Sequence, residues 1–222
     1  MSYRVLIAIE SCQRYRLGPV HDAIRETWFK NIHVTDKRFF YGMDTSMSLQ
    51  CDDPDTTGLN CLDDYNSLSL KTQAICRWAL ERDFDFVFKC DTDTVLNPWE
   101  FVFSAFPSPP DYLGGENADV NVPGFPPNRI EFCSGGAGYW LSKKALTIVA
   151  DAPIIKTSAE DVFVADALLK YGIKPTFHPG YRWRPGAVID KDVVTLHLSS
   201  ASQKKYEPSQ MYEAYQQIKE TL

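Results

Sequence analysis

A strand that ends in two closely spaced acids constrains this chain more than any other feature. Between residues 83 and 98 the sequence reads DFDFVFKCDTDTVLNP. Phe84, Phe86 and Phe88 recur at every second position, and this period in aromatic side chains predicts a β-strand. Asp91 and Asp93 follow it directly. The pair is therefore expected at the carboxyl end of a core strand, the edge where ligands bind in open α/β sheets.

Two carboxylates at such an edge indicate a divalent cation. Carboxylate oxygens are hard ligands that suit Mn²⁺ or Mg²⁺, and these ions are typically shared with a substrate phosphate. Asp91 and Asp93 therefore predict a metal–diphosphate site. The alternative is a surface turn with two solvated acids, which so short a motif also fits.

The composition limits the possible partners. The 222 residues suit one domain, and 44% hydrophobic with 23% charged residues is ordinary for a globular protein. A net charge of −6 argues against a nucleic-acid partner or an anionic membrane surface. No apolar run is long enough to span a bilayer, and the first predicted strand begins near Met1 without a signal peptide. We expect a cytoplasmic or otherwise soluble intracellular protein, with the Golgi lumen only for a trimmed catalytic domain.

The six cysteines do not form a metal motif. They include no CxxC pair, which argues against a zinc cluster. Without an export signal the thiols are expected to be mostly reduced, although Cys51 and Cys61 flank a polar loop and could pair under oxidation.

Predicted strands and helices alternate along the chain. Besides the strand before Asp91, apolar runs predict strands at 4–10, 36–43, 173–178 and 193–199, and a glycine-rich turn entering a strand at 132–141. Helices are expected at 18–30, 67–82, 98–105, 142–150 with Ser142 as N-cap, 160–171 and 207–222. Residues 44–64 read as a polar loop, and residues 108–128 as extended loops and edge strands. This order predicts a single α/β domain with a parallel sheet.

Five segments resemble, in order, the motifs of the β-1,3-glycosyltransferase family, which contains the fringe proteins and the core 1 galactosyltransferases. They are RETW at 25–28, YNSLSLKT at 65–72, KCDTDTVLN at 89–97, SGGAGYWLS at 134–142 and EDV at 160–162. The chain departs from the family pattern at Thr92, which replaces the middle acid of the usual triple, and at Ser67, which replaces an Asn.

The resemblance implies a nucleotide-sugar-binding GT-A fold, with a mixed, mostly parallel central sheet flanked by helices. It implies one catalytic domain over residues 1–222, with a nucleotide-binding half at 1–98 and an acceptor-binding half at 99–222. The implied reaction is a metal-dependent, inverting transfer of a hexose from a UDP-sugar to a hydroxyl of a glycan or glycoconjugate. The implied linkage is β-1,3 and the implied cofactor is Mn²⁺ or Mg²⁺. The sequence does not name the sugar or the acceptor.

The acids at 160–161 are candidates for the catalytic base. An inverting transfer needs a carboxylate that takes the acceptor proton. Thr157 and Ser158 each stand three residues before an acid, so either acid could instead complete a capping box. If Thr157 is the N-cap, Glu160 caps and Asp161 remains free, so Asp161 is the expected base.

A histidine is expected to complete the metal site. His197 lies on a late predicted strand and resembles the family's C-terminal metal-binding His, and neutral imidazole is a competent Mn²⁺ ligand. A packed strand histidine is the alternative reading, and His178 is the competing ligand. His21 and His33 are expected at the surface.

The remaining candidates fall into two groups. Residues expected to bind the donor are Arg25, Lys71, Asp91, Thr92, Asp93, Gly135 and Gly136. The two glycines would let the backbone approach the sugar because they have no Cβ. Residues expected to bind the acceptor are Tyr181, Trp183 and Glu160. A salt bridge is the alternative for Arg25, and an exposed strand end is the alternative for Lys89.

Two other functional classes fit parts of the pattern. Asp91-Thr92-Asp93-Thr94-Val95 also matches the nucleophile loop of haloacid dehalogenase-type phosphohydrolases. That loop normally follows the first strand, whereas two predicted strands precede it here. A catalytically silent nucleotide-sugar-binding module would keep the site without the chemistry.

Overall fold

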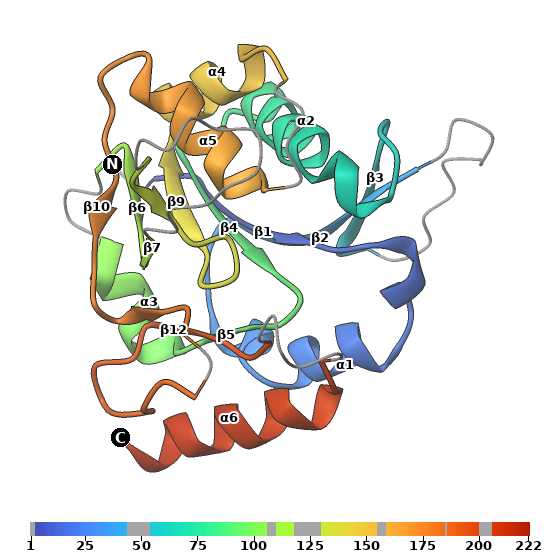
Figure 1. The fold of residues 1–222 in the computed structure, drawn as a ribbon. Helices are drawn as coiled ribbons and strands as arrows, with labels where there is room; N and C mark the ends of the chain where they lie inside the picture. The colour runs from blue at the N-terminus through green and yellow to red at the C-terminus, as the bar shows by residue number, and fades with distance from the viewer. Residues whose placement is uncertain are drawn as a thin grey trace.

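The computed structural model describes residues 3–43, 54–105, 110–117, 130–154, 159–184, 186–199 and 206–222. Its centre is a seven-stranded mixed sheet (Figure 1). In sheet order the strands are β10 (Thr176–Phe177), β6 (Tyr112–Gly114), β9 (Tyr139–Ser142), β4 (Phe86–Asp91), β1 (Val5–Glu10), β2 (Asp36–Gly42) and β3 (Thr56–Leu59). β9 runs antiparallel to both of its neighbours, and every other pairing is parallel. The expected mixed, mostly parallel sheet is confirmed.

Two smaller sheets stand beside the central one. A three-stranded sheet has the order β11 (Tyr181–Arg182), β12 (Thr195–His197) and β5 (Thr94–Leu96). β7 (Glu116–Asn117) pairs with β8 (Phe132–Cys133). β5 follows β4 after a two-residue turn, so this small sheet continues from the edge that carries the acidic pair.

Helices cover both faces of the central sheet (Figure 1). α2 (Leu68–Glu81), α4 (Lys143–Asp151) and α5 (Glu160–Leu169) pack on one face, and α1 (Pro19–Glu26), α3 (Pro98–Ala105) and α6 (Pro208–Glu220) lie on the other. Short 3₁₀ helices occupy 13–15, 29–31 and 65–67. Successive strand residues point to opposite faces, so Ile7 and Ile9 of β1 join the α1 core, whereas Leu6 and Ala8 join the α2 core.

The structure confirms most predicted elements and corrects four expectations. Ser142 caps α4 as expected, because its Oγ accepts from Ala145 N at 3.2 Å. β3 lies inside the segment predicted to be a loop, β6 lies inside the sheet rather than at its edge, and the predicted strand at 173–178 contains only the two-residue β10. His21, expected at the surface, is fully buried against Phe39.

Several expectations lie partly outside the described residues. These include Thr157 and Ser158, the residues expected as caps, and the thiol of Cys51. The N-cap of α5 is Ala159 and no side chain caps it, so the expected capping box is wrong and Glu160 and Asp161 are the first two residues of the helix. Within the described part of the chain, the other five cysteines are free thiols. No helix there has the length and apolarity that a membrane crossing requires. The division into halves at residue 98 stays a prediction, and β6, β9 and β10 of the second half belong to the same sheet as β1 to β4 of the first.

Candidate functional site

The carboxyl ends of β1 and β4 place two acids side by side. The strands run parallel, and Glu10 stands opposite Asp91 in their register. Asp91 is the last residue of β4, and Asp93 lies in the turn that leads to β5. Thr92 in that turn is buried. Asp91 and Asp93 therefore lie at the carboxyl end of a core strand, as the sequence predicted.

Thr94 connects this turn to the glycine-rich segment. Its Oγ1 accepts from Asp91 N at 3.1 Å and donates to the carbonyl oxygen of Gly136 at 2.8 Å. The turn after β4 and the glycine turn before β9 are therefore held against one another.

His197 stands next to Asp93. β12 pairs antiparallel with β5, which places His197 opposite Thr94 and brings its Nε2 to 3.3 Å from Asp93 Oδ2. Burial favours the neutral form of Asp93, but hydrogen bonds from His197 and Ser199 outweigh it and lower the pKa of Asp93. Burial also acts to lower the pKa of His197, but the contact with Asp93 raises it overall.

The donor set at this pair fits a divalent cation. The Nδ1 of His197 lies 3.4 Å from the carbonyl oxygen of Trp183, which can only accept a hydrogen bond. Metal-binding histidines commonly donate one ring N–H to such a carbonyl and keep the other nitrogen for the metal. Here that other nitrogen faces Asp93. The side chains of His197 and Asp93 keep 23% and 18% of their surface exposed, so an ion can reach them from solvent.

Gly135 and Gly136 form the glycine turn before β9, and this turn packs against the side chains of Glu160 and His197. A Cβ on Gly136 would lie 2.7 Å from three ring atoms of His197, and a Cβ on Gly135 would lie 2.3 Å from Glu160 Oε1. Any side chain at either position would displace a neighbour in the site. The expectation that these glycines admit the donor sugar stays a prediction, and in the structure their missing Cβ leaves room for His197 and Glu160.

Asp161 joins the same group from the first turn of α5. Its Oδ2 accepts from Gly135 N at 3.1 Å, and its Oδ1 accepts from Val162 N at 2.9 Å. Burial, and next the charge of Glu160, raise the pKa of Asp161 to about 7. A carboxylate poised near neutral pH can take up a proton during a reaction.

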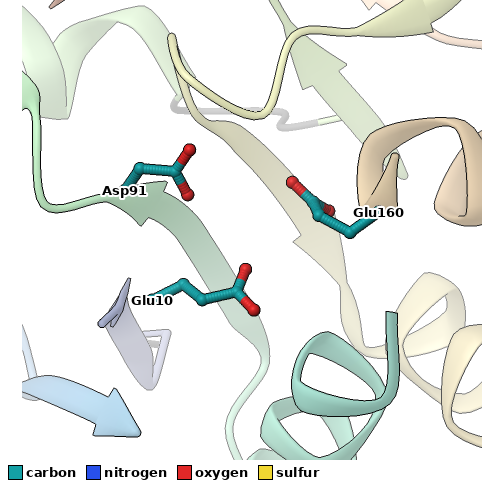
Figure 2. A group of neighbouring side chains, drawn as sticks. All are labelled: Glu10, Asp91 and Glu160. Atoms are coloured by element: carbon teal, nitrogen blue, oxygen red, sulfur yellow. The ribbon is translucent and has the colours of Figure 1, made fainter. Parts of the chain in front are cut away.

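Three carboxylates point toward one another from the end of β1, the end of β4 and the start of α5 (Figure 2). Glu10, Asp91 and Glu160 offer oxygens that lie within 4.8 Å of one another. The ammonium of Lys89 stands among them, at 2.9 Å from Glu10, 2.7 Å from Asp91 and 2.5 Å from Glu160. Lys89 is only 1% exposed, so it is not the exposed strand end that the sequence left open.

Two predicted donor-binding cations already have carboxylate partners. Lys71 is buried and contacts Asp63 at 2.9 Å and the carbonyl oxygen of Ser11 at 2.7 Å. Arg25 makes a two-point contact with Asp55, at 2.9 Å and 2.7 Å. The salt-bridge alternative thus describes the geometry of Arg25. The donor-binding roles of Lys71 and Arg25 stay predictions.

A pocket of about 670 Å³ opens beside the site. Its lining includes Trp183, His178, Arg184 and Glu116. Tyr181, expected to bind the acceptor, is only 2% exposed, and its hydroxyl accepts from the indole N–H of Trp140 at 2.8 Å. Trp183 is half-buried and links the pocket to His197 through its backbone oxygen.

Sequence reasoning missed two members of the site. It did not single out Glu10, and it left Lys89 open to an exposed position. An acid that ends the otherwise apolar run VLIAIE is a signal for Glu10, because a parallel strand brings that end beside Asp91. Asp91 lies two residues from Lys89 on the same strand, but no local pattern identifies its other two partners, Glu10 and Glu160.

Comparisons with known proteins give a likeness of fold. No protein-family model matches the chain, and no curated protein matches it. Among solved structures, the chain resembles one described as a glycosyltransferase involved in the glycosylation of the major capsid of PBCV-1. The likeness covers 97% of this chain and 98% of that chain, with a TM-score of 0.50 and 14% sequence identity. This chain therefore has the fold expected from its sequence, a single GT-A-like α/β domain with a mixed, mostly parallel sheet flanked by helices.

Proposed function

We propose that this protein is a metal-dependent, inverting glycosyltransferase that moves a hexose from a UDP-sugar to a hydroxyl of a glycan or glycoconjugate, forming a β-1,3 linkage. The observation that carries the proposal is the shared glycine turn. Gly135 binds the carboxylate of Asp161, and Gly136 lies against His197, which pairs with Asp93. The candidate base Asp161 and the candidate metal site at Asp93 and His197 therefore contact the same glycine turn. The structural neighbour, which shares this fold, is described as a glycosyltransferase, and this supports the proposal.

Asp161 is the proposed base. The acceptor oxygen attacks the anomeric carbon as the bond from that carbon to the diphosphate oxygen breaks. The acceptor proton passes to Asp161, and the bonding electrons leave with UDP. A pKa of about 7 matches this role, because at neutral pH about half of the chains carry the ionised carboxylate, which can then hold a proton. The hydrogen bond from Gly135 fixes its orientation.

Asp93 and His197 are the proposed Mn²⁺ or Mg²⁺ ligands, with Asp91 and Thr92 beside the donor. When bound, such an ion stabilises the negative charge that develops on the leaving diphosphate. The carbonyl of Trp183 orients the imidazole of His197, and the backbone of Gly136 leaves space for it. Arg25 and Lys71 remain proposed donor-side residues that would act through the acids they contact.

The pocket beside Trp183 is the proposed acceptor site. An indole face suits the apolar face of a sugar ring, and the carboxylate of Glu116 can accept bonds from hydroxyls. Tyr181 lines the same pocket while supporting it from the core. Glu160 is buried against Lys89 and Tyr139, so we propose that it acts on the acceptor side through its neighbour Asp161.

The experiment that tests this proposal is a panel of UDP-sugars with Mn²⁺, scored for transfer and for donor hydrolysis. Asp93→Ala is expected to weaken Mn²⁺-dependent UDP binding, measured by calorimetry, by at least about 10-fold, because losing even a group that orients a metal ligand costs about 10–100-fold in metal affinity. Asp161→Asn is expected to keep UDP affinity and lose transfer by about 10²–10⁴-fold. Asp166→Ala, which removes the carboxylate that pairs with Lys170 on the same helix as Asp161, is the control.

Each alternative predicts a different result. A phosphohydrolase would release phosphate from small phosphoesters and form an aspartyl-phosphate. A silent module would bind UDP with Mn²⁺ but neither transfer nor hydrolyse any donor. Undiminished UDP affinity in Asp93→Ala would remove the metal assignment.

A further inference from the structure

We propose that Lys89 is a positioning residue whose ammonium fills the acidic site formed by Glu10, Asp91 and Glu160, so that this site holds no metal and the divalent ion is directed to Asp93 and His197. The binding of the divalent ion at Asp93 and His197 rests on the proposed function. The filling of the acidic site by Lys89 concerns only the protein's own side chains.

The contacts of Lys89 are complete. An ammonium group has three N–H donors, and Nζ has three carboxylate neighbours at 2.9, 2.7 and 2.5 Å. The other oxygen of Glu160 accepts from the Tyr139 hydroxyl at 2.6 Å, and Thr72 donates to Glu10 at 3.2 Å. The backbone of Lys89 is fixed because β4 lies between β1 and β9.

The same oxygens would suit a divalent ion if the ammonium were absent. They lie within 4.8 Å of one another and come from three carboxylates. Carboxylate oxygens are the ligands that Ca²⁺, Mg²⁺ and Mn²⁺ prefer. A buried cation already at hydrogen-bond distance from all three excludes a second cation by repulsion. Among the described residues no lysine or arginine pairs with Asp93, whose charged partner is the imidazole of His197, so this pair remains open to an ion.

The negative charge around Lys89 exceeds its own positive charge. Three carboxylates surround one ammonium, and burial raises the pKa of Glu10 to about 7, with Lys89 opposing and the other two acids adding to the rise. Oε1 of Glu10 has no hydrogen-bond partner among the described residues. Removal of Lys89 therefore leaves acids that either take up protons or bind a cation.

Lys89 also joins the two sides of the proposed reaction. One contact holds Asp91, beside the proposed metal ligand Asp93, and another holds Glu160, the residue before Asp161. Loss of Lys89 would release β4 and α5 from one another at this edge. Displacements of about 1 Å in a reacting geometry can lower a rate by about 10²-fold.

The test uses Lys89→Met, which keeps the length of the side chain without its charge, and measures ion binding rather than activity. Both the parent and the variant carry Asp93→Ala, which removes the proposed donor-side metal site. Mn²⁺ or Ca²⁺ is added, ion binding is measured by calorimetry, and stability is measured as the melting temperature. Only the chain in which Lys89 is replaced should bind one ion and show a rise in Tm. The parent with Lys89 intact should show neither.

Two results would overturn the occupancy of the acidic site by Lys89. One is a folded Lys89→Met chain that gains no ion binding, and the other is equal ion binding by the parent. If Lys89→Met folds only when the ion is added, the proposal is supported. If it does not fold under either condition, Lys89→Met combined with Glu10→Gln relieves one charge while leaving an oxygen ligand, and the same titration decides.

Turnover tests the positioning role separately. In the chain with Asp93 intact, Lys89→Met is expected to lower kcat by about 10²-fold, while the donor KM stays within a few-fold of the wild-type value. For Lys89→Ala, added ethylammonium should restore part of kcat. Unchanged kcat would overturn the positioning role. Absence of transfer in the wild-type protein would remove the proposed function but leave the ion-binding result intact.

Discussion

At the scale of single residues, burial decides what the acids of this site can do. Asp91 and Asp93 are two residues apart, yet the pKa of Asp93 is lowered because hydrogen bonds from His197 and Ser199 outweigh burial, whereas burial raises the pKa of Asp91 despite the opposing charge of Lys89. Their different partners assign the two acids to different clusters. Asp91 belongs with Lys89, and Asp93 belongs with His197.

Asp161 should make the folded protein less stable as pH rises. Its pKa is about 7 in the folded protein and 3.8 in the reference state. Between these values the folded chain holds a proton that the unfolded chain has released, so the free energy of unfolding falls as pH rises from about 4 to about 7. The side chain of Asp161→Asn cannot ionise, so the variant does not lose this part of its free energy of unfolding as pH rises. In urea titrations it should match the wild-type protein near pH 4 and be more stable at pH 8.

Asp166→Asn is the matched control for that measurement, because Asp166 lies on the same helix and pairs with Lys170 near the surface. Exposed ion pairs contribute at most about 1 kcal/mol, so its difference from wild type should be small at both pH values. Equal stability of Asp161→Asn and wild type at pH 8 would contradict the raised pKa of the Asp161 carboxylate.

At the scale of elements, the glycine turn before β9 fixes the geometry of the site. Gly136→Ala would place a methyl group 2.7 Å from His197 ring atoms, closer than real Cβ contacts. His197 must then move away from Asp93, so Mn²⁺-dependent UDP binding should weaken by at least about 10-fold in calorimetry, given the 10–100-fold cost of disturbing groups that orient a metal ligand. Gly18→Ala, whose methyl would meet Tyr15 O at 3.4 Å, should bind normally.

Asp63 holds three elements together next to the site. Its oxygens accept from the backbone N–H of Gln13 at 2.6 Å, from that of Gly42 at 2.8 Å, and from Lys71 at 2.9 Å. Asp63→Ala leaves the buried ammonium of Lys71 without its carboxylate. Breaking a buried pair in this way typically costs about 3–5 kcal/mol. The expected result is a loss of that size in the free energy of unfolding, measured by chemical denaturation.

The neighbouring Asp64 provides the comparison for Asp63. Asp64 is exposed, and its side chain makes no capping bond to the 3₁₀ helix that follows it. Asp64→Ala should therefore change the free energy of unfolding by no more than about 0.5 kcal/mol. Similar losses in the two variants would show that Asp63 does not join these elements energetically.

At the scale of the whole molecule, the central sheet unites both parts of the chain. β4 pairs with β1 on one side and with β9 on the other, so strands from before and after residue 98 share one set of hydrogen bonds (Figure 1). The two hydrophobic cores lie on opposite faces of this one sheet. Neither half can unfold without exposing apolar surface of the other.

Unfolding should therefore occur in a single transition. Trp140 lies in the α1-side core and Trp78 packs against the α2-side core, so tryptophan fluorescence reports on both faces. Fluorescence and far-UV circular dichroism should give the same denaturation midpoint. Two separated midpoints would show that the halves at 1–98 and 99–222 unfold independently.

Much of this protein could be predicted from local sequence. Phe86 and Phe88, two of the three alternating phenylalanines, lie in β4, Ser142 caps α4, and the acids at 160–161 begin α5, because each signal acts over a few residues. The strand β3 was missed because Thr56–Leu59 is short and lies in a polar segment. β6 was predicted as an edge strand because the flanking segments are rich in proline, but in the sheet it pairs with β10 on one side and β9 on the other.

The sequence by itself determined the elements and the edge of the sheet where the acids gather, since strand periodicity and helix caps depend on neighbouring residues. The tertiary structure alone decided which charges meet. Lys89 is buried among Glu10, Asp91 and Glu160, and His197 reaches Asp93, because strands and a helix from distant parts of the chain end at the same place. Charge pairing over such sequence distances depends on the packing of whole elements, and no local pattern records it.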